Sequence, residues 1–194
     1  MPTTHDFPNC HFRAEAGVRY YVPQDLSIAE VVFGANCGPA SLAACLSQEV
    51  SDIMRYLPHF EDENRRYTNL TAMKAALKAA AVKFEVTKCT LPSKGLALIQ
   101  WTGPWTEKQF FSRWSLLYTH WIAVDGQMFY DLHSKCWLHH EEWTAKVVPF
   151  YLADLPQAAG WAIKYGIEVE KSSSAWPGSF LDLLFRRPNR MLSK

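Results

Sequence analysis

The sequence predicts an α+β fold, because helical patterns fill its first half and strand patterns fill its second. Apolar residues recur at helical spacing between residues 37 and 80. Continuous or alternating apolar segments, with one tight turn, occupy residues 82–170. Helices followed by strands that are joined through a hairpin favour a helical layer packed on an antiparallel sheet.

The central helix is predicted in the segment GANCGPASLAACL, residues 34–46. Asn36 is a suitable N-cap for it, because its side-chain oxygen can accept from a backbone N–H of the first turn. Pro39 is tolerated in that turn, since the N–H that it lacks would have no helical partner there. Leu42, Cys45 and Leu46 then recur at helical spacing, and we expect Cys45 to lie in the core.

Three further helices are expected, two of them with a predicted cap. They are 51–57, capped by Ser51 and ended by Pro58; a helix that starts near Asn69 and has Leu70, Met73, Leu77 and Ala80 on its apolar face; and 106–117, capped by Thr106. Residues 1–30 read as irregular, apart from a short strand-like segment at 18–23.

The strands of the second half are predicted from alternation and from one turn. Asp125 and Gly126 form the preferred kind of two-residue loop between the two strands of a hairpin. The strands expected are 82–86, 96–101, 119–124, 127–132, 147–155 and 161–170.

The length of 194 residues suits one domain with a tail. We place the domain at residues 1–170. We read 171–194 as a linker and a C-terminal tail that either packs back on the domain or docks on a partner protein. The net charge of +1 carries no sign of nucleic-acid binding. No apolar stretch is long enough for a membrane span.

The five cysteines, Cys10, Cys37, Cys45, Cys89 and Cys136, include no CxxC pair, so neither a zinc ribbon nor a thioredoxin-type site is indicated. The N-terminus lacks the pattern of a signal peptide. We therefore expect a cytoplasmic protein with free thiols, with non-classical secretion left open. Two groups, His133, Cys136, His139 and His140, and His5, Cys10 and His11, meet no recognised ligand spacing, so we expect neither a metal nor a cofactor.

Cys37 is the candidate nucleophile, because it opens the central helix. The free N–H groups and partial positive charge of a helix start stabilise a thiolate, which is the reactive form of cysteine. Gly38 would leave space for a substrate carbonyl beside the sulfur, and the backbone N–H of Cys37 is a natural donor to an oxyanion. The alternative is that Cys37 is a small buried residue at an ordinary helix start.

The hairpin brings a histidine and an acid together by arithmetic. If Asp125 and Gly126 are the loop residues, His120 lies directly opposite Asp131 on the same face, with Cβ atoms about 4.5–5.5 Å apart. The apolar residues of that face, among them Ile122, predict that it packs towards the helix of Cys37. A nucleophilic cysteine needs a base and an orienting group, and this pair supplies both.

The order of Cys37, His120 and Asp131 resembles that of papain-like cysteine peptidases, and residues 30–134 look most like the bacteriocin-leader (double-glycine) peptidases. The resemblance implies a papain-like fold, with Cys37 as nucleophile, His120 as base and Asp131 as orienting acid. In that superfamily an upstream glutamine completes the oxyanion hole. The segment before Cys37 has none, so Asn36 and Gln24 are the candidate donors, and Leu132 stands where the resembling peptidases often have proline.

The predicted function is therefore a cysteine peptidase that cleaves an amide or isopeptide bond in a peptide or protein. Two alternatives stay open. The same triad can serve a deamidase or acyltransferase, and a papain-like scaffold can be an inactive binding protein.

Overall fold

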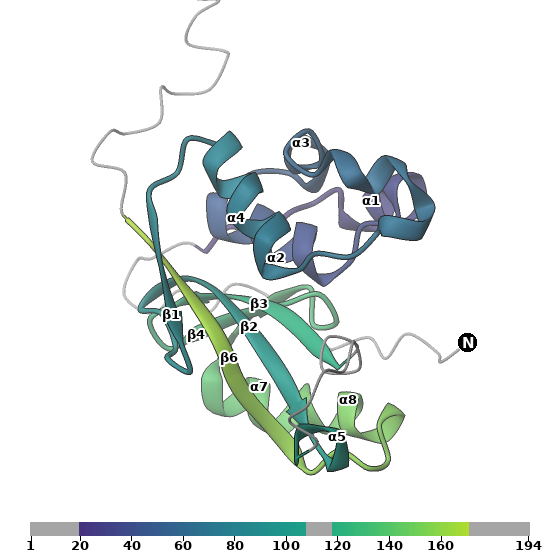
Figure 1. Cartoon of the computed structure of the whole chain (residues 1–194), viewed down its shortest axis with the longest axis vertical. Coiled ribbons are helices and arrows are strands. Elements are labelled where there is room, and N and C mark those ends of the chain that lie inside the picture. Colours follow the sequence, from purple (N-terminus) through teal and green to yellow (C-terminus); the bar gives the residue numbers. More distant parts are fainter. Residues whose placement is uncertain (1–19, 108–117, 171–194) are drawn as a thin grey trace, which may run out of the picture.

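The computed structural model describes residues 20–107 and 118–170, and these form an α+β fold (Figure 1). A six-stranded antiparallel sheet has helices on both of its faces. The predicted α+β class is therefore confirmed. The predicted tail at 171–194, Cys10 and most of the predicted helix 106–117 lie outside the described residues, and the boundary at residue 170 remains a prediction.

The helical layer is built from the first half of the described chain and covers one face of the sheet. Two short 3-10 helices follow the third α-helix. The elements are α1 (Leu26–Phe33), α2 (Cys37–Leu46), α3 (Val50–Met54), η1 (Pro58–Glu61), η2 (Glu63–Arg65) and α4 (Leu70–Ala79).

The sheet has the strand order β1-β6-β2-β3-β4-β5. β6, the last strand in the chain, lies between β1 and β2, so the first and the last strand of the chain pair with each other. The strands are β1 (Phe84–Lys88), β2 (Lys94–Thr102), β3 (Thr119–Asp125), β4 (Met128–Asp131), β5 (Cys136–His139) and β6 (Gly160–Val169).

Two hydrophobic cores lie on opposite faces of the sheet, each between the sheet and the helices that cover that face. The α2-side core holds Leu42 of α2, Met73 of α4 and Trp121 of β3. The α7-side core lies on the opposite face, where Ile122 packs with residues of α7 (His140–Lys146) and α8 (Val148–Asp154). A further short helix, α5 (Pro104–Glu107), lies on that side as well (Figure 1).

The helix α2 lies against the sheet through small side chains. Ala40, Leu42 and Ala43 are fully buried, and they pack in one core with Trp121 and Ala123 of β3. Small residues let the helix axis approach the sheet closely, and this fixes the start of α2 with respect to β3. The predicted central position of this helix is confirmed.

The start of α3 differs from its prediction. The helix begins at Val50, and the carboxylate of Asp25 accepts hydrogen bonds from the backbone N–H groups of Val50 and Ser51, both at 2.8 Å. Ser51 is thus not the cap. Asp25 just precedes α1, a helix that was expected to be irregular chain, and the prediction failed because this cap comes from a distant segment.

One strand of the second half was predicted wrongly, and two elements were not predicted. The predicted strand 147–155 is instead the helix α8 (Val148–Asp154), because Val148, Tyr151, Leu152 and Leu155 repeat at helical spacing and Pro149 fits the first turn. Residues 136–146, for which the sequence analysis predicts no element, contain β5 and α7. The described part of the strand-like segment 18–23 has no strand.

The cysteines differ in state. Cys37, Cys45 and Cys89 are free, as expected, but the expectation of free thiols is wrong for Cys136, which is disulfide-bonded. Cys45 packs against the α2-side core, and burial raises the pKa of its thiol to about 12. Among the free thiols of the described residues, Cys45 is therefore a poor nucleophile.

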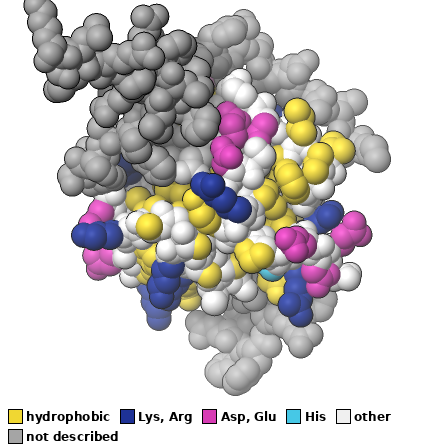
Figure 2. All heavy atoms as spheres, turned by 90° about the horizontal axis from the view of Figure 1, so that it is seen from above, with side chains coloured by type: hydrophobic (Ala, Val, Ile, Leu, Met, Phe, Trp, Pro, Cys, Tyr) yellow, Lys and Arg dark blue, Asp and Glu magenta, His cyan; other side chains and the backbone are white. Residues whose placement is uncertain are grey.

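The outer face of the helical layer mixes charged side chains with hydrophobic ones (Figure 2). Ile28, Val31 and Val32 of α1 are among the exposed large hydrophobic residues. Among the described residues, no helix has the length and the apolar character that crossing a membrane would require.

Candidate functional site

Cys37 is the first residue of α2 and is half-buried. Asn36 has the extended backbone of an N-cap, and its Oδ1 accepts a hydrogen bond of 3.2 Å from the N–H of Gly38. The predicted cap is therefore confirmed. This cap stabilises the first turn of α2. The Cys37 thiol therefore lies at the end of the helix that carries the partial positive charge.

The hairpin register differs from the prediction by two residues. Asp125 pairs with Met128, and Val124 pairs with Phe129, so the loop residues are Gly126 and Gln127. Gly126 has a φ of +61°, and glycine in the first loop position is what a type II′ turn favours. In this register His120 is not directly opposite Asp131. A shift of two residues nevertheless leaves both side chains on one face, since strand side chains alternate with a period of two.

The face that carries His120 is not the one that packs on α2, contrary to the prediction. Ile122, on the face of His120, lies in the α7-side core, whereas Trp121 and Ala123 face α2. The pairing of β3 with β4 ends at Ala123 and Tyr130, so the two strands are not paired at His120. Cys37 approaches His120 in this region.

The backbone of Trp121 connects α2 to this part of β3, which pairs with β2 but not with β4. Ser41, one turn after Cys37, donates a hydrogen bond of 2.9 Å to the Trp121 carbonyl oxygen. His120 and the backbone of Trp121 both lie close enough to the Cys37 thiol to lower its pKa. These contacts hold the start of α2 beside His120. They use backbone groups of β3 that would pair with β4 if β4 were longer.

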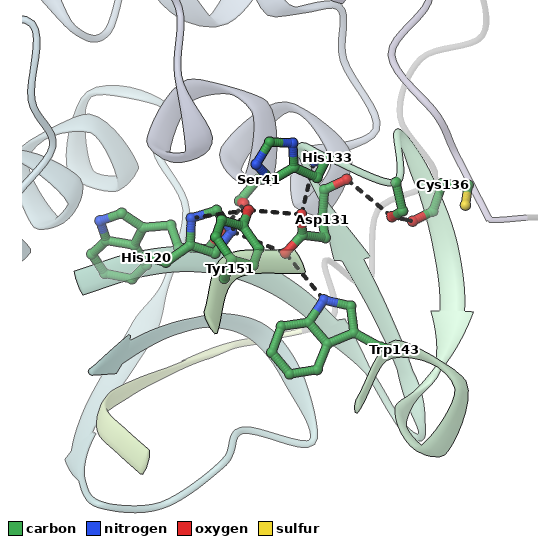
Figure 3. Close-up of polar contacts among 9 residues, drawn as sticks. Ser41, His120, Asp131, His133, Cys136, Trp143 and Tyr151 are labelled. Carbon is green, nitrogen blue, oxygen red and sulfur yellow. Dashed lines mark hydrogen bonds and ion pairs between the residues drawn. The ribbon is translucent and has the colours of Figure 1, made fainter. Parts of the chain in front are cut away.

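His120 and Asp131 form the centre of the cluster shown in Figure 3. His120 Nε2 lies 2.9 Å from Asp131 Oδ2. His120 is 6% exposed and Asp131 is 0% exposed, so the pair is shielded from water. The structure brings all three residues of the predicted triad together.

Asp131 has three further donors, none of which was predicted from the sequence (Figure 3). Trp143 Nε1 on α7 donates to Oδ2 at 3.0 Å, Tyr151 on α8 donates to Oδ1 at 3.1 Å, and the His133 backbone N–H donates to Oδ1 at 2.8 Å. The helical spacing of Val148, Tyr151 and Leu155 was the signal that could have found Tyr151. This spacing places the three side chains on one face of a helix, and that face points towards the sheet.

The charges at the site favour an ion pair between Cys37 and His120. Burial by itself raises the pKa of the Cys37 thiol, but the charge and hydrogen bond of His120 and the Trp121 backbone outweigh it, so the pKa lies below its usual value. Burial lowers the pKa of His120, whereas the negative charges of Asp131 and Cys37 raise it more strongly, to about 10. Both shifts therefore favour the Cys37 thiolate and the His120 imidazolium.

Asp131 stays ionised in spite of its burial. Burial raises the pKa of its carboxyl, but the charge of His120 and hydrogen bonds from His120, His133 and Trp143 bring that pKa below its usual value. Tyr151 shows the opposite shift, because burial and the charges of Asp131 and Cys37 raise the pKa of its hydroxyl well above the usual value. The hydroxyl of Tyr151 is thus a permanent hydrogen-bond donor.

The two predicted oxyanion donors are both engaged elsewhere. Asn36 Nδ2 donates to the backbone oxygen of Arg66 at 2.8 Å, while its oxygen caps α2. Gln24 Nε2 donates to the Val22 carbonyl, and its backbone N–H donates to Glu49, which follows the far end of the ten-residue helix α2. A helix of that length spans about 15 Å, so Gln24 does not share the site with Cys37.

Gly38 has a different role from the one predicted. A Cβ at this position would lie 2.3 Å from Thr68 Oγ1 and 2.4 Å from Thr68 Cβ. The space beside this glycine is therefore filled by Thr68 and is not open to a substrate carbonyl.

The histidines that follow the triad form no metal centre in the described part of the chain, where no group of three or more His, Cys, Asp or Glu side chains is arranged to hold a metal ion. His133 packs its ring against Phe150 and Tyr151, with ring centroids 4.4 Å and 4.7 Å away. The role of this exposed histidine is thus aromatic contact with α8.

Comparisons of the chain with protein-family models, with curated proteins and with solved structures found no match.

Proposed function

We propose that the protein is a papain-like cysteine peptidase that cleaves an amide or isopeptide bond in a peptide or protein. The observation that carries this proposal is that Cys37, His120 and Asp131 lie next to one another in this order. The thiol sits at a helix start beside a buried imidazole that lowers its pKa, and a fully buried carboxylate lies 2.9 Å from the Nε2 of that imidazole. Nucleophile, base and orienting acid are the three parts of thiol-based acyl transfer.

The chemistry begins with the Cys37 thiolate, which attacks the substrate carbonyl carbon. A C–S bond forms, and the carbonyl π electrons move to oxygen. The C–N bond then breaks, and the leaving amine takes a proton from the His120 imidazolium. Water next attacks the thioester as His120 removes its proton, which releases the carboxylic acid and regenerates the thiolate. Asp131 keeps the imidazole oriented during both proton transfers.

The oxyanion of this reaction would be stabilised by the backbone N–H of Cys37 in the first turn of α2. This donor needs no side chain, and the helix dipole adds to its effect. The proposal thus assigns Asn36 the role of fixing the helix start, which orients the N–H, and gives Gln24 no role in turnover.

The test of the proposal is turnover of a mixture of peptides, read by mass spectrometry as new N-termini. Wild-type protein should produce cleaved peptides, and Cys37→Ala should produce none. Cys45→Ala is the matched control, because it removes a buried thiol of the same helix and should leave cleavage unchanged. Cleavage that survives in Cys37→Ala would refute the proposal.

A deamidase or acyltransferase would use the same three residues and differ only in the leaving group or the acceptor. The same reaction mixtures separate these outcomes. Ammonia release with a mass gain of about 1 Da on glutamine marks deamidation, and a new amide with an added amine marks acyl transfer.

An inactive papain-like binding protein is the second candidate, and one observation favours it. Both predicted side-chain donors for an oxyanion are bound elsewhere, Asn36 to Arg66 and Gln24 to Val22. If wild-type protein processes neither peptide, isopeptide nor glutamine substrates but retains binding to a protein, this candidate replaces the peptidase.

A further inference from the structure

Tyr151 on α8 lies between the base and the acid of the proposed triad (Figure 3). Its hydroxyl oxygen is 2.9 Å from His120 Nε2 and 3.1 Å from Asp131 Oδ1. Its distance to His120 Nδ1 is longer, 3.5 Å. The hydroxyl therefore adds a second connection beside the direct contact of 2.9 Å between His120 Nε2 and Asp131 Oδ2.

The direction of these hydrogen bonds follows from the protonation of each group. Asp131 is ionised and can only accept. Tyr151 stays protonated, because burial and the charge of Asp131 raise its pKa well above the usual value. The hydroxyl proton thus goes to Asp131 Oδ1, and the oxygen of the hydroxyl is left to accept from the Nε2–H of His120.

This arrangement decides which ring nitrogen of His120 keeps its proton. Nε2 faces two acceptors, a carboxylate oxygen and a phenol oxygen, so it is the protonated nitrogen when the imidazole is neutral. Nδ1 is then the nitrogen left to exchange a proton with Cys37, whose thiol pKa is lowered by the ring. A carboxylate alone can hold a ring in this way, but a second, differently placed acceptor restricts its rotation further.

The phenol itself is held in place by its neighbours. Trp101 of β2 lies 4.8 Å from the Tyr151 ring centroid, and His133 lies 4.7 Å from it. These two rings and the α7-side core fix the position of Tyr151, so its hydroxyl is preorganised before any substrate binds.

We propose that Tyr151 is a positioning residue of the site, whose hydroxyl joins His120 to Asp131 and holds Nδ1 of the imidazole towards Cys37. The inference rests on the proposed peptidase function for its effect on turnover. The groups that face the hydroxyl are Cys37 from α2, His120 from β3, Asp131 from β4 and His133 from the chain that follows β4.

The test compares Tyr151→Phe with wild-type protein, and uses Tyr165→Phe as the matched control. Tyr165 is a half-buried residue of β6 that packs against the other core, so its variant also loses one hydroxyl but not at the site. Tyr151→Phe should lower kcat about tenfold with KM within twofold of wild type, since orientation is lost and substrate contacts are kept. Tyr165→Phe should change neither.

A second readout needs no substrate, and it separates this inference from the proposed function. In ¹⁵N-labelled protein, with His120 assigned by the loss of its signals in His120→Gln, the Nε2–H proton should be visible at low field. It should give a nuclear Overhauser effect to the ring protons of Tyr151. In Tyr151→Phe this proton should exchange with water at least tenfold faster.

Each outcome decides one of the two proposals. Wild-type protein that shows the Nε2–H contact but cleaves nothing would refute the peptidase and retain the bridge. Absence of that contact in wild-type protein would overturn the bridge, even if Tyr151→Phe does not fold. A Tyr151→Phe variant with wild-type kcat and exchange rate, or with only a raised KM, would overturn the positioning role.

Discussion

His120 Nε2 and Asp131 Oδ2 lie 2.9 Å apart although the two residues are not cross-strand partners. Asp125 pairs with Met128 in the hairpin, and continuing this register would set Asp131 opposite Ile122, two positions from His120. Diagonal neighbours of this kind on one face remain within reach of long side chains. The contact is completed by α7 and α8, which bring Trp143 and Tyr151 to the same carboxylate.

Asp131→Asn tests how much the site depends on this carboxylate. Asp131 accepts from four donors, so an amide NH₂ in its place would face an N–H or O–H and leave acceptors missing. We expect a loss of about 1–3 kcal/mol in the free energy of unfolding and a roughly 10²–10⁴-fold drop in turnover. Denaturant titration and peptide cleavage measure the two effects. Unchanged turnover would contradict the orienting role.

The pH dependence of Cys37 alkylation tests the ion pair. Iodoacetamide reacts with the thiolate, and the pKa of Cys37 is lowered by His120. Its rate should therefore level off at a lower pH than that of N-acetylcysteine, whose thiolate forms around pH 8.5. Peptide cleavage should fall again near pH 10, where His120 loses the proton that the leaving amine needs. An alkylation profile that coincides with the free thiol would exclude the ion pair.

Gly38→Ala should destabilise the protein by about 1–3 kcal/mol, because the new methyl group would overlap Thr68 and the start of α2 must shift. Turnover should fall as well, since the shift moves Cys37. Gly160→Ala is the control, because its nearest contact is an ordinary 3.5 Å from Thr102 Oγ1. Thermal unfolding of both variants would measure the difference, and equal melting temperatures would show that the site has unexpected room.

The cap of α3 provides a test of the fold outside the site. Asp25→Ala removes both acceptors at the helix start and should cost about 1 kcal/mol of the free energy of unfolding. Ser51→Ala, at the position that the sequence suggests as the cap, should cost less because Ser51 is exposed. A larger loss for Ser51→Ala would contradict the assignment of Asp25.

The predictions from sequence succeeded where a local pattern is sufficient. Asn36 was predicted as a cap, and a helix was predicted to start near Asn69. Both side chains accept from N–H groups within three residues of them. The hairpin was found from Asp125 and Gly126, but its register was missed by two residues because Gly126 takes the first and not the second loop position. Because a shift of two residues leaves side chains on the same face, His120 and Asp131 still share a face of the sheet.

The predictions failed where a distant part of the chain decides. Asp25 caps a helix that begins 25 residues later. Trp143 reaches Asp131 from a helix that was not predicted, and Tyr151 reaches it from a helix that was predicted as a strand. The face of the hairpin that meets α2 was also misassigned, because both faces of the sheet are buried and hydrophobicity alone does not distinguish them.

The most direct test of the Cys37, His120 and Asp131 assignment is labelling with a peptidyl acyloxymethyl ketone, a substrate-like reagent that alkylates activated thiols. Wild-type protein at pH 7 should gain one label, and tryptic mapping should place it on Cys37 and not on Cys45 or Cys89. In His120→Ala, with folding checked by thermal unfolding, labelling should be at least tenfold slower, because burial then raises the pKa of a thiol that has lost its cation. Label on Cys89 in preference to Cys37, or equal rates in wild type and His120→Ala, would contradict the account.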